Sequence, residues 1–165
     1  MLAVLTSVSL PIFAATLQGS RINGAVIQLD SDIRSARALA LSKGGFYGLH
    51  LGRDDVLVVN PAHKNSYRIE YSSDGATWPL ETATTGSSTA VITDWQQDLS
   101  TQFTGMTVQS VVDGVATAIG GPIFNSIGAS VDLANAIRSV TITLAHSSGP
   151  TKVIQINPAG NVKRP

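Results

Sequence analysis

The first 20 residues, Met1 to Ser20, contain no charged side chain. As an α-helix, the apolar part up to Leu17 would be about 25 Å long, close to the ~30 Å hydrocarbon core of a bilayer. Three alternatives fit this segment: a secretory signal peptide, a buried core helix, or the C-terminal part of a membrane-embedded helix that continues into a soluble helix. A signal peptide is disfavoured because no basic residue precedes the apolar run.

The residues that follow favour the third alternative, because they continue a helix with one apolar face. Glycines at 44–45 provide an end, and Lys43 lies in the last turn, where a cation complements the helix dipole. We therefore predict one helix from about Leu2 to Lys43. Pro11 is expected to kink it, and an interruption near Pro11 and Gly19 stays open. Apolar residues at intervals of three and four form a stripe that we expect to pack on a sheet: Ile22, Val26, Leu29, Ile33, Ala36 and Ala40.

After residue 45 the period of the sequence changes from helical to alternating. Short runs rich in aromatic and β-branched residues are separated by turn residues. We predict strands at residues 46–51, 56–59, 67–71, 90–93, 107–112, 123–125, 139–145 and 151–157. The predicted fold class is α+β, with a long N-terminal α-helix packed on an antiparallel β-sheet or β-sandwich head. We divide the chain into an apolar segment, residues 1–20, and a globular domain, residues 21–165, which comprises the helix 21–43 and the β head 46–165.

Charge is scarce and unevenly distributed in this chain of 165 residues. Basic and acidic residues balance at 11 each, and charged residues make up 13%, against roughly 25% in an average soluble domain. This excludes a nucleic-acid binder held by bulk positive charge and a highly charged disordered chain. Residues 70–132 contain only acidic charges and residues 138–165 only basic ones, a pattern that suits head-to-tail docking. The absence of cysteine excludes disulfides and zinc–thiolate sites.

No group of residues predicts catalysis, a metal site or a cofactor. His50, His63 and His146 lie far apart, without the spacing of metal ligands. The adjacent carboxylates at 54–55 are typical of a turn, and no Gly-x-Ser-x-Gly sequence is present. The Gly-Gly-Pro run at 120–122 indicates a turn rather than a phosphate loop. We therefore predict a protein that is not an enzyme and has no small-molecule substrate.

Two tryptophans stand in the polar surroundings typical of loops. Trp78 and Trp95 could each anchor a protein or sugar partner, because exposed tryptophans are frequent in binding sites. The alternative, a tryptophan that packs over the edge of the sheet, is favoured. Any partner contact is expected within residues 73–102.

Two blocks of the chain resemble one protein family. The C-terminal block contains F-x-x-x-G at 124–128, the predicted hairpin at 139–156 and a final G-x-[VI] at 160–162. Together with the helical block, in this order, it resembles the type IV pilin-like proteins, and more narrowly the minor pseudopilins of the H type (the GspH/FimT group). The helical block has the pattern L-x-x-D-[IL]-x-x-A-R-x-x-A-[LI], here Leu29, Asp32, Ile33, Ala36, Arg37, Ala40 and Leu41.

The resemblance implies a mechanical function without a cofactor. The protein would be a minor pilin or pseudopilin, a structural subunit of a type II secretion pseudopilus or a type IV pilus that acts in filament initiation or at the tip and in protein secretion. It would be a single-pass protein of the bacterial inner membrane, with its head in the periplasm, that assembles with other pilin or pseudopilin subunits. The residues implied for the membrane and filament helix are Leu2, Val4, Leu5, Val8, Leu10, Pro11, Ile12 and Phe13.

Family members begin with a basic leader, a glycine at the cleavage site and an apolar start that contains a glutamate, and the processed N-terminus is methylated. None of these features precedes the apolar run here. If Pro11 matches the family's helix proline, the sequence begins about ten residues inside that helix. Two alternatives stay open: the true N-terminus lies upstream of Met1, or the protein is not processed.

A different class of function is an exported β-sandwich that binds DNA or a glycan. DNA-uptake members of the family end in a Gly-Arg-x-Arg motif, and here Asn161 and Lys163 stand at the two arginine positions, followed by Arg164. Lys163 and Arg164 could contact phosphates, but two charges supply only weak, salt-sensitive binding.

Overall fold

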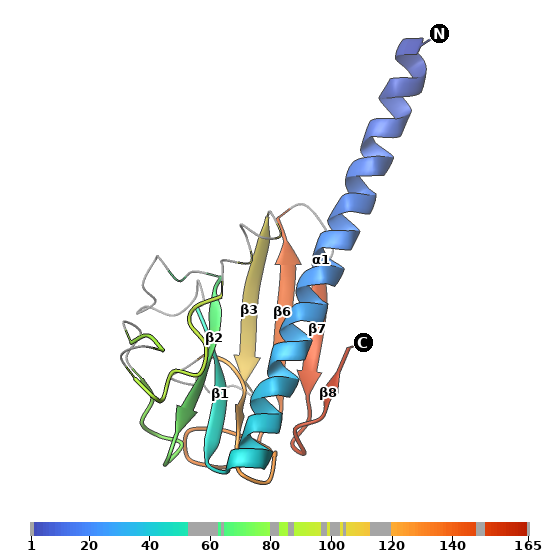
Figure 1. Ribbon diagram of the computed structural model, residues 1–165. Helices are drawn as coiled ribbons and strands as arrows, with labels where there is room; N and C mark the ends of the chain where they lie inside the picture. Colours follow the sequence, from blue (N-terminus) through green and yellow to red (C-terminus); the bar gives the residue numbers. More distant parts are fainter. Residues whose placement is uncertain are drawn as a thin grey trace.

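One long helix lies against a head of two antiparallel sheets, and the N-terminal half of the helix extends beyond the head (Figure 1). The computed structural model describes residues 2–52, 63, 65–79, 83–85, 88–96, 99, 103, 105–112, 120–147 and 151–164, with only the backbone for residues 2–15 and 109–112. The predicted α+β fold class, with a long N-terminal helix packed on an antiparallel β head, is confirmed.

Helix α1 spans Leu2–Lys43 as one uninterrupted element. The alternative of an interruption near Pro11 and Gly19 is therefore wrong. A proline removes one backbone hydrogen bond and a glycine lowers helix propensity, but the turns on either side can continue the helix. The end of the helix is where it was predicted, because Gly44 and Gly45 adopt left-handed backbone conformations with φ of 73° and 83°.

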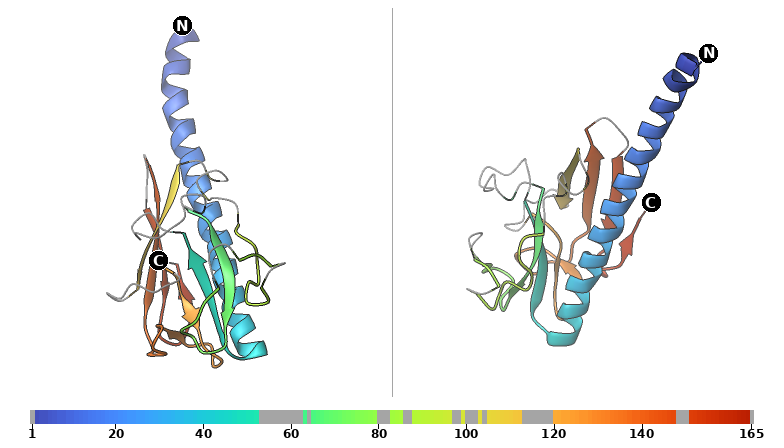
Figure 2. Two further views of the ribbon diagram at one scale, coloured as in Figure 1. Left: turned by 90° about the vertical axis from the view of Figure 1, so that its left-hand side faces the viewer. Right: turned by 45° about the horizontal axis from the view of Figure 1, so that its top comes forward.

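The head consists of two four-stranded sheets. Sheet A has the order β2-β1-β4-β5, with β1 Phe46–Leu51, β2 Tyr67–Ser72, β4 Ile123–Phe124 and β5 Ser130–Val131. Sheet B has the order β3-β6-β7-β8, with β3 Met106–Val112, β6 Val140–His146, β7 Thr151–Ile156 and β8 Val162–Lys163. Strands β2 and β8 are edge strands and lie on opposite sides of the head (Figures 1 and 2).

The core lies between α1 and the two sheets. All six residues of the helical stripe are buried, with exposed fractions of 0–7%. They share one hydrophobic cluster with Leu49 of β1, Ile142 of β6 and Ile154 of β7. One face of the helix therefore packs against both sheets. Strand β6 alternates as its sequence predicts, because Val140, Ile142 and Leu144 are buried while Thr141 and Thr143 are half-buried.

Most predicted strands exist, with some shifts at their ends. The predicted strand at 90–93 is wrong, because Val91 forms only an isolated bridge to Glu70. The predicted strand at 56–59 lies outside the described residues. Strands β5 and β8 were not predicted, because an element of two residues is too short to show an alternating pattern. The remaining predictions correspond to β1, β2, β3, β4, β6 and β7.

Candidate functional site

The helix is attached to the head by polar contacts as well as by its apolar stripe. The Tyr67 hydroxyl donates a hydrogen bond of 2.6 Å to Asp32 Oδ2, which joins β2 to α1. Tyr67 is 1% exposed. Burial, and then the hydrogen bond to Asp32, raise the pKa of the Tyr67 hydroxyl well above its usual value. The hydroxyl therefore stays protonated and remains a donor to the helix.

A second contact joins α1 to the C-terminal end of the described chain. The buried carboxylate of Asp30 accepts a hydrogen bond from Arg34 Nε at 3.0 Å and forms an ion pair with Arg164 Nε at 3.3 Å. Arg34 also donates to the backbone oxygen of Val162 at 3.4 Å. Arg164, a predicted DNA contact, is thus paired with the helix, while the other predicted contact, Lys163, is exposed on β8.

The arginine of the helical motif contacts both glycine turns of the C-terminal block. Arg37 Nε donates to the backbone oxygen of Gly128 at 3.0 Å, and Arg37 Nη2 donates to that of Ala159 at 3.0 Å. We name this group the Arg37 clamp. It brings together motif residues that lie about 90 and 120 positions apart in the chain.

The glycines of these turns are required by geometry. Gly128 and Gly160 have φ of 73° and 76°, in the left-handed region that favours glycine. A Cβ added to Gly160 would lie 1.9 Å from the backbone oxygen of Gly128, which cannot move away as a flexible side chain could. The motif residues therefore have a structural task, which is to fix the C-terminal turns against α1.

Both tryptophans pack within the head. Trp78 is half-buried, donates from Nε1 to the backbone oxygen of Gly75 at 3.0 Å, and packs on a small cluster formed by Ile123 and Val131. Trp95 is half-buried and stacks on His63, with ring centroids 4.3 Å apart. These positions match the packing alternative, and a partner contact at Trp78 or Trp95 stays a prediction.

A buried ionic cluster lies under Trp95. Arg68 and Glu70 are both 0% exposed, and Arg68 Nε donates to Glu70 Oε1 at 2.6 Å. His50 Nδ1 lies 3.0 Å from the same oxygen, and the Arg68 guanidinium lies 4.6 Å from the Trp95 ring centroid. Arg68 also donates to the backbone oxygen of Ala83. The cluster therefore attaches the loop around residues 83–96 to the outer face of sheet A.

Sequence reasoning missed this cluster. The one available signal was the i, i+2 spacing of Arg68 and Glu70 in a predicted strand, which places opposite charges side by side on one face. A strand with one polar face predicts exposure of that face. Here the face is covered by a segment that lies distant in sequence, so both charges are buried.

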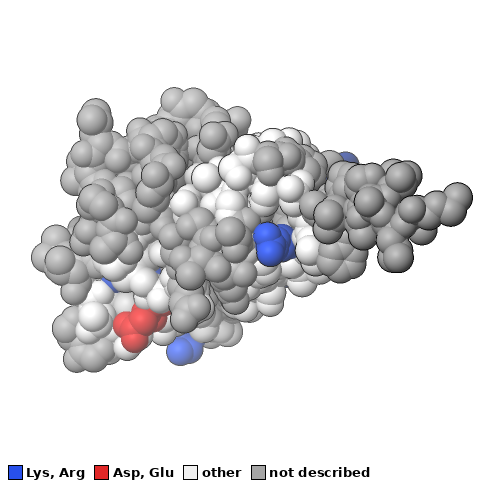
Figure 3. All heavy atoms as spheres, turned by 90° about the horizontal axis from the view of Figure 1, so that it is seen from above, with Lys and Arg blue, Asp and Glu red and all other residues white. Residues whose placement is uncertain are grey.

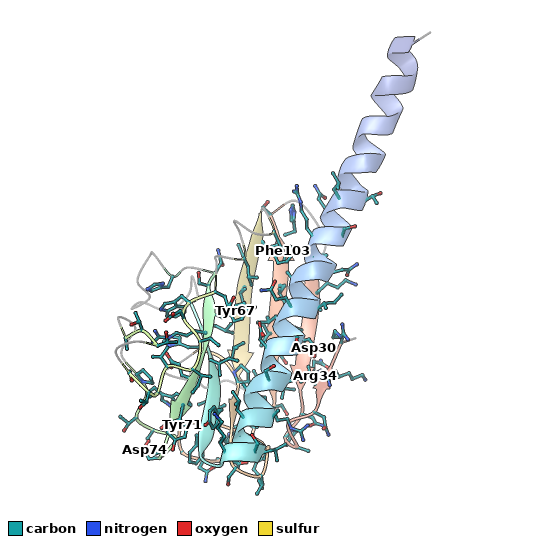
Figure 4. The ribbon with its side chains drawn as sticks, in the orientation of Figure 1. Asp30, Arg34, Tyr67, Tyr71, Asp74 and Phe103 are labelled. Atoms are coloured by element: carbon teal, nitrogen blue, oxygen red, sulfur yellow. The ribbon has the colours of Figure 1, made fainter. Side chains whose placement is uncertain are left out.

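Two exposed carboxylates lie in the loops next to β2. Asp74 accepts hydrogen bonds from the backbone N–H of Thr77 and of Ala76, at 2.8 and 2.9 Å, and these bonds lower the pKa of its carboxyl. Asp94 accepts two bonds of 2.9 Å from Thr85, which likewise lower the pKa of Asp94. Both side chains therefore stay negative well into the acidic range (Figure 4 labels Asp74).

The described residues contain no group of three His, Asp or Glu side chains that could hold a metal ion. The rings of His50 and His63 both contact the Trp95 ring, whereas His146 is the last residue of β6. The carboxylates at 54–55 lie outside the described residues, and Gly120 to Pro122 lead into β4.

The surface seen from the N-terminal end is mostly uncharged in its described part (Figure 3).

The side chains of the predicted membrane and filament segment, Leu2 to Phe13, lie outside the described residues, while its backbone forms the start of α1. Among the described residues, no helix has a stretch both long and apolar enough to cross a bilayer.

The fold matches known structures, although the sequence does not match known families. No protein-family model and no curated protein matches the sequence. The type IV minor pilin FimU of Pseudomonas aeruginosa is similar over 88% of this chain and 89% of its own, with a TM-score of 0.57 and 15% identity. The minor pseudopilin EpsH from the type 2 secretion system of Vibrio cholerae is similar over 88% of this chain and 96% of its own, with a TM-score of 0.55 and 8% identity. The chain therefore has the pilin fold, in which one N-terminal helix packs on antiparallel sheets.

Proposed function

We propose that the chain is a structural subunit of a pilin-like filament, without catalysis of its own. The observation that supports this most is the division of α1: a stripe from Ile22 to Ala40 is buried in the head, whereas the part before it extends beyond the head (Figure 1). A helix that extends from a folded head and is apolar all round needs lipid or other helices around it. The pilin fold of the head agrees with this function.

We assign residues 1–20 to the filament core and to the inner membrane before assembly, and residues 21–165 to a periplasmic head. The small residues of the first segment, such as Ala3, Ser7 and Ala14, would allow close packing between helices. Exchange of lipid for a helix bundle changes little apolar exposure, so the same segment can serve in both surroundings. Processing and N-terminal methylation are part of this proposal.

Within the pilin-like proteins we favour a minor pseudopilin of the H type, which acts at the start or tip of the filament in type II secretion or in a type IV pilus. The support is that Arg37, Gly128 and Gly160, three residues of the separate motif blocks, meet in one contact. The genomic sequence upstream of Met1 tests this assignment cheaply. An in-frame Gly-Phe-Thr-Leu-x-Glu-like run supports it, and a plain basic secretory start contradicts it.

A fractionation experiment tests the function itself. The protein, expressed from its own locus, is expected in the membrane fraction and in sheared filaments. The variant Ile12→Asp should be lost from both the membrane fraction and the filaments, because a carboxylate in the first half of α1 is costly in lipid and in a helix bundle. Protease resistance of its head should be unchanged.

The matched control is Ile127→Asp, which makes the same change at a side chain that is 73% exposed on the head. This variant should fractionate like the wild type. Equal recovery of Ile12→Asp and Ile127→Asp in both fractions would reject the proposed function, as would a folded wild-type protein that enters neither fraction.

A further inference from the structure

A polar hollow of about 500 Å³ lies on sheet B, on the face opposite to α1. Val140, Ile142 and Ile154 of this sheet are buried in the core that contains α1, so the residues that alternate with them point to the other face. Ligand sites commonly have volumes of about 300–1,000 Å³, and the hollow lies within this range. Its polar lining comes from three adjacent strands and the turns at their ends: Ser139, Thr141, Gln155, Asn157, Asn161 and Lys163.

Three of these residues form one row across the sheet. Thr141 of β6 is the register partner of Gln155 of β7, and Gln155 is the register partner of Lys163 of β8. These three strands lie side by side (Figure 1). Residues paired in this way stand on the same face, and neighbouring strands are about 4.8 Å apart. The row therefore places a hydroxyl, an amide and an ammonium group next to one another over about 10 Å.

The polar groups of this row are available to a ligand. Within the part of the chain that the structure describes, the side chains of Thr141, Gln155 and Lys163 form no hydrogen bond or ion pair. The four strands of sheet B contain no aspartate or glutamate, so no carboxylate of the sheet neutralises Lys163. Asn161 extends the polar surface at the turn, where its backbone N–H donates to Asn157 Oδ1 at 2.9 Å.

The chemistry of the hollow matches a sugar that carries a carboxylate. Hydroxyl and amide side chains both donate and accept hydrogen bonds, as the hydroxyl groups of a sugar ring require. The ammonium group of Lys163 can donate a charge-assisted hydrogen bond to a carboxylate.

Other classes of ligand fit the hollow less well. Its two apolar residues, Val140 and Ile156, are each 1% exposed, so they offer almost no apolar surface to a peptide or a lipid chain. Among the described residues that line the hollow, Lys163 is the only charged one. A nucleic acid binds mainly through several phosphates, and a single cation provides little affinity for it.

We propose that this hollow binds a carboxylated saccharide. The carboxylate lies against Lys163, and the ring hydroxyls lie along Gln155 and Thr141. No aromatic side chain lines the hollow in its described part, so the sugar rings gain no stacking and binding is weak and reversible. The site uses no residue of α1, so this inference goes beyond the proposed filament function and does not depend on it.

Titration of the full chain in mild detergent, followed by saturation-transfer NMR, tests the proposal. The probe is cellobiouronate, a disaccharide with one carboxylate, and we expect it to bind. The matched neutral ligand is cellobiose, which has a hydroxymethyl group in place of the carboxylate. Cellobiose should bind about tenfold more weakly, because it lacks the charge-assisted hydrogen bond. Glutarate has carboxylates but no ring hydroxyls, and it should also bind more weakly than the probe.

Substitutions in the row locate the site. Lys163→Met should weaken the binding of cellobiouronate about tenfold and leave that of cellobiose nearly unchanged. Thr141→Val with Gln155→Met should weaken the binding of both disaccharides about fivefold, because both lose hydrogen bonds to their hydroxyls. The matched control is Lys43→Met, which removes an exposed lysine at the end of α1 and should change neither affinity. Near-ultraviolet circular dichroism should show the same fold for all variants.

Several results would overturn the proposal. Absence of binding, or equal binding of cellobiouronate and cellobiose, would reject an acidic sugar as the ligand. Equal effects of Lys163→Met and Lys43→Met would reject the location. Glutarate that binds as tightly as the probe would mean a simple anion contact, and a short DNA duplex that displaces the probe at lower concentration would assign the hollow to phosphates. Recovery of Lys163→Met in membranes and filaments should equal that of the wild type whichever ligand result is found, so the proposed function is judged separately.

Discussion

The two halves of α1 are both rich in apolar residues, but they are buried in different ways. The second half has its apolar residues on one face, from Ile22 to Ala40, and this face is buried against both sheets. The first half has no charge before Arg21 and extends beyond the head (Figure 1). In this molecule the periodicity of apolar residues, rather than their number, decides which part of the helix joins the head.

The largest expected change in the free energy of unfolding comes from truncating a side chain on the buried face of α1, in comparison with its exposed face and with its first half. Ile33→Ala removes a side chain that is 0% exposed, and we expect it to lower the free energy of unfolding by about 2–5 kcal/mol. Ile27→Ala on the exposed face should change it by less than ~0.5 kcal/mol. Denaturant titration of the full chain in mild detergent, followed by near-ultraviolet circular dichroism, measures both values.

Leu10→Ala extends the same comparison to the first half. This residue lies in the part of α1 that extends beyond the head, so the stability of the head should be unchanged. A loss similar to that of Ile33→Ala would show that the first half also packs on the head, and the contrast between the halves would be wrong.

The second effect concerns the polar attachment of the helix. Arg37→Met removes two charged donors and leaves the backbone oxygens of Gly128 and Ala159 without them, which should cost about 1–3 kcal/mol. Arg34→Met is the comparison, because the side chain of Arg34 is 56% exposed and Asp30 keeps its ion pair with Arg164 when Arg34 is removed, so the loss should be smaller than for Arg37→Met. Thermal unfolding of both variants gives the comparison. A smaller loss for Arg37→Met than for Arg34→Met would contradict the importance of the clamp.

Local periodicity predicted most of this fold. The stripe of α1, its end at Lys43 and the alternation of β6 are each encoded in fewer than about twenty consecutive residues, so the sequence displays them directly. The alternative of an interruption near Pro11 and Gly19 was wrong, because local propensity describes a preference that neighbouring helical turns can override.

The contacts between distant segments could not be predicted. Nothing near Arg68 in the sequence indicates that the loop around residues 83–96 covers it, so its burial was missed. The resemblance placed Arg37 and Gly160 in the same family pattern, but their contact through the turns at Gly128 and Ala159 became visible only in three dimensions. The prediction of a strand at 90–93 is wrong for a related reason. Its residues hydrogen-bond to the edge of β2 through Ala90 and Ile92, and these bonds do not form a regular ladder.

The third effect depends on pH. Tyr67→Phe removes the donor to Asp32 and should lower the free energy of unfolding by about 1 kcal/mol near neutral pH. The folded state raises the pKa of Tyr67, so this contribution is complete below about pH 10, the ordinary value, and disappears as the pH rises toward the folded-state pKa. The difference between wild type and Tyr67→Phe should therefore shrink above pH 10. A difference that stays constant from pH 8 to 11 would contradict the raised pKa.

The smallest expected effect concerns DNA binding by the C-terminal residues, which contact the second half of α1 through the ion pair of Arg164 with Asp30. Asp30 already pairs with Arg164, which reduces the charge that this arginine can offer DNA, while Lys163 is exposed on β8. In a gel shift at low salt we expect at most a weak complex, lost at moderate salt, with a salt slope of about 2 for two phosphate contacts. Lys163→Ala with Arg164→Ala should abolish it, while Arg21→Ala with Lys43→Ala, which removes equal charge from α1, should not.

Equal binding by the two double variants, or no complex at low salt, would remove DNA from the partners of this chain. Strong binding would instead mean that DNA phosphates displace Asp30 from Arg164, and that the C-terminus is held by the helix less firmly than its ion pair indicates.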